Sequence, residues 1–308
     1  MHPSLRLPCL VTTFAALLLA VNSPARAQTA PAASTAPAKT YKVNLSPALK
    51  VGQKLALVSD ITSDMNMDIT ISAPGMPAPQ VQHQKQAAVV HLEGDCEVLA
   101  VTAEGGPKKL AVTVKALKAT QNGSAIPGLP NVGDKIIAER ISKKDKTLTV
   151  GDKPLSLAVT KLLKDSIPAD IDGQNDQIMF GPNDSVAVGA TWAPNPSMLA
   201  DVQESLPSAS GIDGSMKLES MQGGGQVAKV SGTLNVLGAT LPLPPPMNNF
   251  PVQCTVQLNG TFPTMAKGAF DQSMKMDMKC AGDADAGGAH LKIDMTATQS
   301  ATQTVTLP

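Results

Sequence analysis

Apolar and polar residues alternate through most of this chain, and this pattern constrains the fold more than any other feature of the sequence. In PVQCTVQLNG, residues 251–260, the apolar Val252, Cys254, Val256 and Leu258 occupy every second position, and HLKIDMTA, residues 290–297, follows the same rule. Successive side chains of a β-strand point to opposite faces, so period-2 alternation predicts strands with one dry and one wet face. The chain is therefore predicted to be mainly β and antiparallel.

Clusters of Gly, Pro, Asn and Asp divide the alternating sequence into segments, which is typical of strands joined by turns. We expect about ten strands: 53–72, 84–103, 109–120, 134–150 (one strand or a hairpin), 185–192, 214–222, 226–238, 251–260, 270–280 and 289–306. Between the last two, the turn-rich AGDADAGG, residues 281–288, predicts a hairpin connection.

One segment departs from the β pattern. In PLSLAVTKLLKDSIP, residues 154–168, apolar residues recur at helical spacing, Pro154 suits a first turn and Pro168 follows the end. We expect a helix over about 154–165, packed on the sheet through Leu155, Ala158, Val159, Leu162 and Leu163. A weaker pattern predicts a second helix over 196–205.

The N-terminus reads as an export signal. Residues 1–27 contain Arg6, an apolar run from Leu10 to Val21, and Ala25-Arg26-Ala27. A basic start, a short apolar core and a small-x-small ending are typical of a cleaved leader that is too short to span a membrane. The sequence therefore predicts cleavage after Ala27 and an exported protein, periplasmic or extracellular, with no membrane span.

After the leader, residues 28–40 consist mostly of Ala, Pro, Thr and Ser. Such a composition cannot bury a core, so this segment is expected to be a disordered spacer. The remaining residues, 41–308, are predicted to form a single β-rich domain, with a division into two lobes near 166–185 as the alternative.

Charge and aromatic content exclude some partners. Removal of residues 1–27 takes away Arg6 and Arg26 and no acidic residue, leaving 23 basic and 25 acidic residues. A near-neutral chain with scattered charges lacks the basic footprint of nucleic-acid binding. The single Trp, the single Tyr and the few Phe residues are also too few for base-stacking platforms. We therefore expect no nucleic-acid partner.

Three cysteines follow the leader: Cys96, Cys254 and Cys280. Export to an oxidising compartment favours one disulfide and leaves one thiol over. Cys254 and Cys280 both fall on the apolar side of their strands, so a shared core brings them together if the strands are neighbours. We prefer this pair, although bridging depends on Cα separation rather than on sequence distance.

Several short segments carry a family resemblance: VGQKLALV at 51–58, GDCEVLAV at 94–101, KLAVTVKAL at 109–117, VAVGATW at 186–192 and KGAFDQSM at 267–274. In this order, with the helix between them, they resemble a group of secreted bacterial β-rich proteins of unknown function. The resemblance implies a curved antiparallel sheet with helical decoration, similar to the half-barrels of periplasmic lipoprotein carriers. It implies no catalytic residues.

The stretch QSMKMDMKC, residues 272–280, places Met274, Met276, Met278 and Cys280 on one side of a strand. Thioether and thiolate sulfur are soft ligands that suit Cu(I), so these residues form a candidate copper site. Met is also a flexible apolar filler, and the intervening Lys-Asp-Lys has the character of a solvated face. We favour the core interpretation, because a chain with few aromatic residues needs Met to fill volume; Met65 and Met67 repeat the pattern.

No motif of an enzyme is present. The histidines after the leader, His83, His91 and His290, form no HExxH, and the sequence contains no GxSxG and no glycine-rich phosphate loop. We therefore expect a non-enzymatic protein without a cofactor. Its default ligand site is the apolar concave face of the sheet, partly lined by Met and closed by residues 154–165, which suits a lipid or another apolar molecule. The alternatives are an envelope protein–protein interaction module and the copper site.

Overall fold

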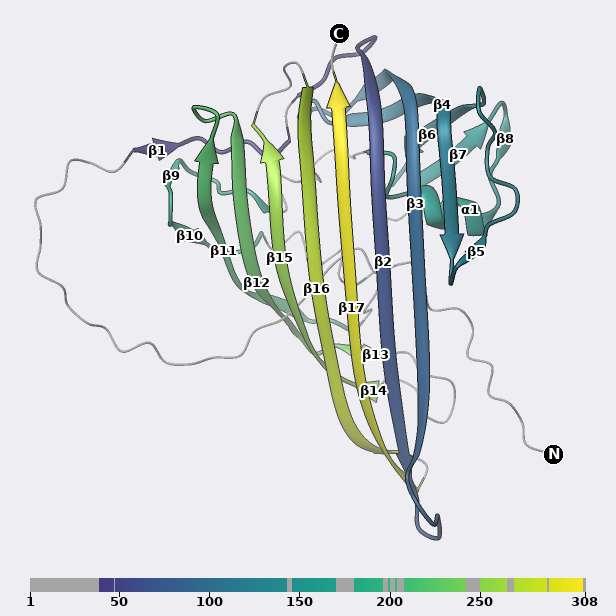
Figure 1. The fold of residues 1–308 in the computed structure, drawn as a ribbon. Coiled ribbons are helices and arrows are strands. Elements are labelled where there is room, and N and C mark those ends of the chain that lie inside the picture. The colour runs from purple at the N-terminus through teal and green to yellow at the C-terminus, as the bar shows by residue number, and fades with distance from the viewer. Residues whose placement is uncertain are drawn as a thin grey trace, which may run out of the picture.

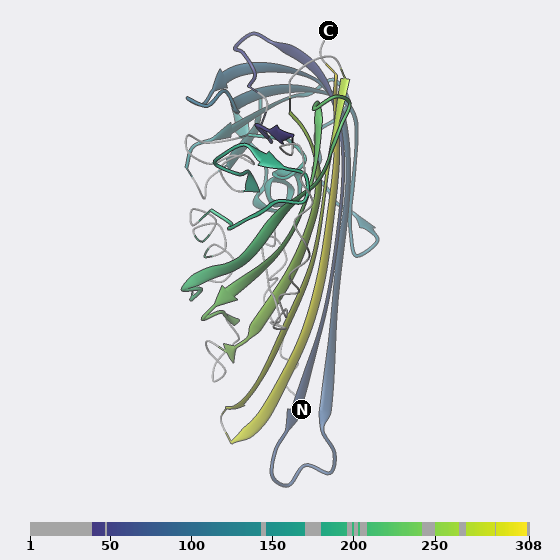
Figure 2. The same ribbon diagram turned by 90° about the vertical axis from the view of Figure 1, so that its left-hand side faces the viewer.

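The computed structural model describes residues 39–46, 48–142, 146–169, 180–195, 199, 203, 208–241, 250–264, 269–286 and 288–306. Within these residues, thirteen strands form one antiparallel sheet, in the order β10-β11-β12-β15-β16-β17-β2-β3-β4-β6-β7-β8, with β5 paired to β4. Figures 1 and 2 show this sheet as a curved wall with helix α1 on its concave side. The prediction of a mainly β fold, with a curved antiparallel sheet and a packed helix, is confirmed.

The strands of the main sheet are β2 (Lys54–Ser72), β3 (Gln80–Val101), β4 (Pro107–Gln121), β5 (Ser124–Ala125), β6 (Lys135–Arg140), β7 (Lys146–Val150), β8 (Lys153–Pro154), β10 (Thr191–Trp192), β11 (Gly211–Gln222), β12 (Val227–Leu237), β15 (Gln253–Pro263), β16 (Ala269–Ala286) and β17 (Ala289–Thr306). Two short pairs lie outside it: β1 (Thr40–Tyr41) with β9 (Val186–Ala187), and β13 (Thr240–Leu241) with β14 (Phe250–Pro251).

The centre of the sheet joins the two ends of the chain. The last strand, β17, pairs with β2 along all but its first residue, from His290 opposite Ser72 to Thr306 opposite Ala56. The long strands β16, β17, β2 and β3 therefore stand side by side in the middle of the wall (Figure 1). Because of this pairing, the concave face at the centre of the sheet is formed by residues about 230 positions apart in the sequence, such as Met67 and Met295.

Two expected elements differ in the structure. The strand predicted over 270–280 continues to Ala286, so Asp283 and Asp285 lie within β16, opposite Lys292 and His290, and not in a loop. Alternation persists through GDADA, residues 282–286, and the sheet extends with it. The strand predicted over 185–192 divides into β9 and β10, which pair with β1 and β11. Gly189 lies between them with φ of +88°, a conformation that turns the chain.

Helix α1 (Leu157–Leu163) is shorter than predicted. Pro154 pairs with Thr149 in β8 instead of opening the helix, and the side chain of Ser156 caps the first turn by accepting a hydrogen bond from the Val159 amide at 3.3 Å. Val159 and Leu163 are buried, whereas Ala158 is exposed. The second expected helix, 196–205, falls outside the described residues except for Leu199 and Gln203.

The concave face holds two hydrophobic cores. The methionine core lies on β11, β12, β15 and β16 and the adjoining parts of β17 and β2, and it contains Met65, Met67, Met216, Met276, Met278 and Met295. The branched core lies on the other parts of β2 and β17, on β3, β4, β6 and β7, and on α1; its larger members are Leu, Ile and Val, such as Leu92, Val112 and Leu163.

The segment after α1 is attached to the sheet by polar contacts. The ammonium group of Lys146 on β7 donates to the carbonyl oxygens of Lys164 and Ile167, which follow the helix. The side chain of Gln303 on β17 donates to the Asp165 carbonyl oxygen at 3.3 Å. A cation near a helix C-terminus satisfies carbonyls that lack helical partners. These contacts hold α1 over the branched core. In the described part of the chain, no helix combines the length and apolar character needed to cross a membrane.

Candidate functional site

The methionine stretch lies on the concave face of β16. Met276, Met278 and Cys280 are buried, at 7%, 5% and 2% exposure, and Met274 is half-buried. Lys275, Asp277 and Lys279 point to the outer face, where the Lys275 ammonium lies 2.6 Å from an Asp277 carboxylate oxygen. This hydrogen bond, with a second from Thr298 Oγ1 at 2.8 Å, lowers the pKa of Asp277 against the opposing effect of burial. One face is therefore dry and the other carries paired charges.

The sulfur atoms of Cys280 and Cys254 are bonded to each other. The two residues are directly opposite on β16 and β15, with their Cα atoms 4.0 Å apart. Because its sulfur is in the disulfide, Cys280 offers no thiolate to a metal ion in this state. The candidate copper ligands that stay available on β16 are thioethers, and the copper hypothesis remains a prediction.

Strand order extends the sulfur-bearing row beyond β16. Cys254, Cys280, Met295 and Met67 are successive cross-strand neighbours on β15, β16, β17 and β2. Neighbouring strands lie ~4.8 Å apart, so the four side chains form one transverse row across the concave face. Unbranched Met side chains repack with little strain, and they give this part of the face an adaptable surface.

Between the two cores, the concave face of β2 and β17 becomes mostly polar and small-chained, and its one large apolar side chain is Ile61, which lies between Ser59 and Ser63 and is 6% exposed. We call this region the inter-core strip; its residues are Ser59, Ser63, Ala297, Gln299, Ala301 and Gln303. Gln299 is directly opposite Ser63, and Gln303 is directly opposite Ser59. Ser59 is fully buried, but the other five are half-buried, unlike Met295 and Val305 on either side. The strip is thus a partly open band between two closed cores.

Two polar atoms of the strip have no hydrogen-bond partner. Of the described side chains, those of Ser59, Ser166 and Gln299 each have a buried oxygen without one, namely Ser59 Oγ, Ser166 Oγ and Gln299 Oε1. Buried polar atoms are paired in the great majority of cases, and leaving one unpaired costs ~1–3 kcal/mol. The strip therefore contains unused hydrogen-bonding capacity facing the concave side.

The outer face has no catalytic constellation among the described residues. His91 Nδ1 lies 2.7 Å from Asp60 and its Nε2 lies 3.0 Å from Glu93, His83 lies 2.7 Å from Asp68, and His290 bridges Asp283 and Asp285. The hydrogen bond that His91 donates to Asp60, assisted by Glu93, raises the pKa of His91 against the opposing effect of burial. Each imidazole is engaged by carboxylates, and no nucleophilic side chain contacts it in these pairs. No group of three His, Cys, Asp or Glu residues in the described part is arranged to hold a metal ion.

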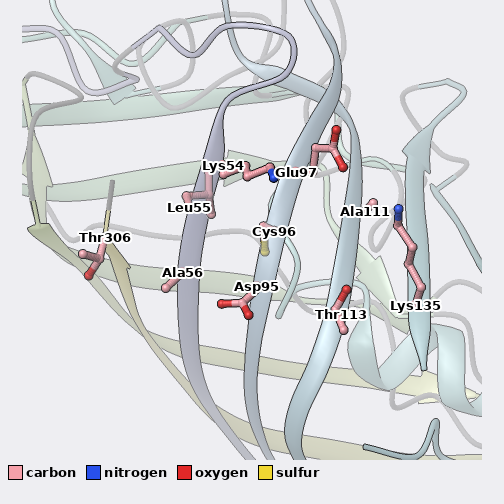
Figure 3. Close-up of a pocket in the computed structure, with 10 residues that line it drawn as sticks. All are labelled: Lys54, Leu55, Ala56, Asp95, Cys96, Glu97, Ala111, Thr113, Lys135 and Thr306. Atoms are coloured by element: carbon pink, nitrogen blue, oxygen red, sulfur yellow. The ribbon is translucent and has the colours of Figure 1, made fainter. Parts of the chain in front are cut away.

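A depression of about 480 Å³ lies on the outer face over β2, β3, β4 and β6. Small side chains such as Ala56, Ala111 and Thr113 form its floor, and charged Lys54, Asp95, Glu97 and Lys135 surround it (Figure 3). Asp95 is also paired with Lys115 at 2.5 Å. Charges of both signs around a shallow floor favour water over an apolar ligand, so we do not assign the candidate site to this depression.

The remaining thiol is unsuited to chemistry. Cys96 lies in the branched core at 3% exposure, and its burial, with a smaller effect of Asp95, raises its pKa to about 12. The thiolate is the reactive form of cysteine, so this thiol is a structural side chain.

Sequence reasoning identified the methionine stretch but missed the strip. The signal was present in TATQSATQTV, residues 296–305, where Gln299 and Gln303 occupy positions that alternation assigns to the apolar face. Such a break in an otherwise apolar face marks either an exposed stretch or a polar site. Only the pairing with Ser59 and Ser63 decides between them, because it places the four polar residues on one face.

Comparison with known proteins adds little. No protein-family model matches the chain, and no curated protein matches its sequence. Among solved structures, the chain aligns with a TodX monoaromatic hydrocarbon channel mutant (8% identity, TM-score 0.18, covering 88% of this chain and 96% of that one). It also aligns with a Pseudomonas aeruginosa FadL homologue (7% identity, TM-score 0.16, covering 82% and 90%). TM-scores this low carry no argument about fold or function, so a function for this chain has to be inferred from its own residues.

Proposed function

We propose that this chain is an exported, non-enzymatic protein that binds a lipid or another apolar ligand on the concave face of its sheet, at the inter-core strip. The observation that carries the proposal is the partial exposure of the strip between two cores whose neighbouring residues are almost fully buried. An apolar concave surface that stays partly open is the usual form of a small-molecule site. The leader over residues 1–27 supports export.

The surroundings of the strip suit a hydrocarbon. Met274 and Ile61 are the cross-strand neighbours of Ala301, and Met65 is the neighbour of Ala297. The small alanine side chains leave space above the sheet, and the adjacent thioether side chains adapt their shape to an occupant. Burial of apolar surface there contributes ~25 cal/mol per Å² of hydrocarbon removed from water.

Native mass spectrometry tests this function on residues 28–308, purified from the periplasm without detergent and compared before and after organic extraction. We expect extra mass that disappears on extraction. The Ala301→Phe variant fills the strip and should purify without this mass. Its matched control, Thr302→Phe, is the next residue on β17 and points to the outer face. A bare wild-type chain, or equal loading of the two variants, would refute the proposal.

A second function, that of an envelope protein–protein interaction module, is favoured by one observation on the sheet edge. The pairing of β3 with β4 ends at Ala88 opposite Gln121, whereas β3 continues to Gln80. Within the described strands, residues 80–86 of β3 therefore pair on one side only, as an edge that accepts an added strand. A photo-crosslinking side chain at Lys85 should capture a partner in cells, and one at the exposed Lys292, which is paired on both sides, should not; capture at both positions or at neither would count against it.

A further inference from the structure

The nature of the ligand follows from the polar atoms of the inter-core strip, and this inference rests on the proposed function. A site for a bare hydrocarbon needs no polar groups, yet Gln299 and Ser59 stand on the concave face with Oε1 and Oγ buried and unpaired. Ser59 is 0% exposed. An unpaired acceptor in a low-dielectric site is costly in the free protein and becomes favourable when a donor arrives.

The charges around the strip limit the headgroup that it accepts. None of its six residues is ionisable. Alternation directs the charged residues of the same strands, such as Asp60, Asp64 and Lys292, to the outer face, where they are exposed. A charged headgroup beside Gln299 would therefore find no counter-ion among the residues of the strip itself, and burying an unpaired charge is far more costly than burying a hydroxyl or an amide.

We propose that the ligand is an uncharged amphiphile, an alkyl chain bearing a hydroxyl or amide N–H that donates a hydrogen bond to Gln299 Oε1. Its hydrocarbon lies along the strip against Ala297, Ala301 and the half-buried Met274. Gln299 thereby acts as the residue that selects hydroxylated or amide-bearing chains over bare ones.

Isothermal titration calorimetry with two probes of similar length tests the headgroup. The alcohol 1-decanol donates a hydrogen bond, whereas 1-methoxydecane only accepts one. We expect wild-type protein to bind 1-decanol about fivefold or more tightly, the value of one net hydrogen bond of ~1 kcal/mol. In Gln299→Leu, the affinity for 1-decanol should fall to that for 1-methoxydecane, and the latter should not fall. Gln257→Leu, on the exposed outer face of β15, is the matched control and should leave both affinities unchanged.

The melting temperature provides a second test, because a purely structural role of Gln299 and Ser59 predicts a different result. Because Gln299 Oε1 and Ser59 Oγ are unpaired in the free protein, Gln299→Leu and Ser59→Ala should leave the melting temperature unchanged or raise it. A fall in melting temperature for both variants would assign the two side chains to structure and overturn the inference. Equal wild-type affinity for the two probes overturns the headgroup inference alone. Binding of neither probe, together with the absence of extractable mass, overturns the proposed function as well.

Discussion

The two cores of this sheet use different side chains for the same task. The methionine core contains six buried Met residues, three buried Phe residues and the disulfide, whereas the buried residues of the branched core include no Met and no aromatic side chain in the described part of the chain. Leu, Ile and Val have few rotamers and pack rigidly, whereas Met fills irregular spaces and repacks readily. The branched core is therefore the rigid part of the concave face and the methionine core is the adaptable part. The inter-core strip lies between them.

The largest expected effect comes from the cross-link that only the methionine core has. Replacing Cys254 and Cys280 together by alanine opens a loop of 26 residues, and the free energy of unfolding should fall by ~3 kcal/mol. Urea denaturation measures this loss. In the branched core, Cys96→Ala removes only a small buried thiol and should cost ~1 kcal/mol. Equal costs would show that the disulfide does not distinguish the two cores.

Glycine substitutions compare the rigidity of the branched core with the adaptability of the methionine core. A Cβ added at Gly94, in the branched core, would lie 2.7 Å from Val112 Cγ1 and 2.8 Å from the Thr113 carbonyl oxygen. A Cβ at Gly232, in the methionine core, would lie 2.4 Å from Met216 Sδ, which belongs to a flexible side chain. We expect Gly94→Ala to cost ~2–3 kcal/mol and Gly232→Ala ~1 kcal/mol or less in urea denaturation. The reverse order would contradict the comparison.

Replacement of methionine residues distinguishes a role in filling the core from a role in binding metal. Met276→Leu with Met278→Leu conserves volume and should change the free energy of unfolding by less than ~1.5 kcal/mol. Under the core interpretation, Cu(I) uptake measured by competition with a chromogenic chelator should be negligible in wild type and variant alike. Uptake by the wild type that disappears in the variant would instead assign the methionine stretch to copper.

The smallest expected effects are pH dependences on the outer face. The pKa of His91 is raised by Asp60 and Glu93 against the opposing effect of burial, so its contribution to stability is fully present below the unfolded pKa and is lost as pH rises through the folded value. Between pH 8 and pH 6 the melting temperature should rise by no more than about 2 °C, and less in His91→Gln.

On the outer face opposite the methionine core, the contribution of Asp277 to stability depends on pH in the opposite direction from that of His91. Its pKa is lowered by Lys275, so its contribution is present above the unfolded pKa and is lost as pH falls through the folded value, below the usual 3.8. The Asp277→Asn variant should therefore be less sensitive to acid than the wild type in this range. Identical acid curves for the two proteins would show that the Lys275 pair is without consequence.

Alternation determined the strands and their faces because it is local. The central strands 53–72 and 289–306 were predicted to within one residue of β2 and β17, and the concave or outer position of Met276, Cys254 and Lys275 follows from their place in the pattern. The predicted start of the helix at Pro154 was wrong, because a proline fits the first turn of a helix and the end of a strand equally well. Only the pairing of Pro154 with Thr149 decides between them.

The choice of neighbouring strands belongs to the tertiary structure, because pairing joins segments whose sequences carry no record of each other. The register that sets Cys254 against Cys280, Met67 against Met295 and Ser63 against Gln299 arises from strand order. Local sequence was therefore sufficient for a β protein with an apolar, Met-bearing face. The gathering of four polar side chains into one half-open strip between two cores depended on β17 returning to pair with β2, since hydrogen-bonded neighbours are fixed by the ladder of the whole sheet and not by local preference.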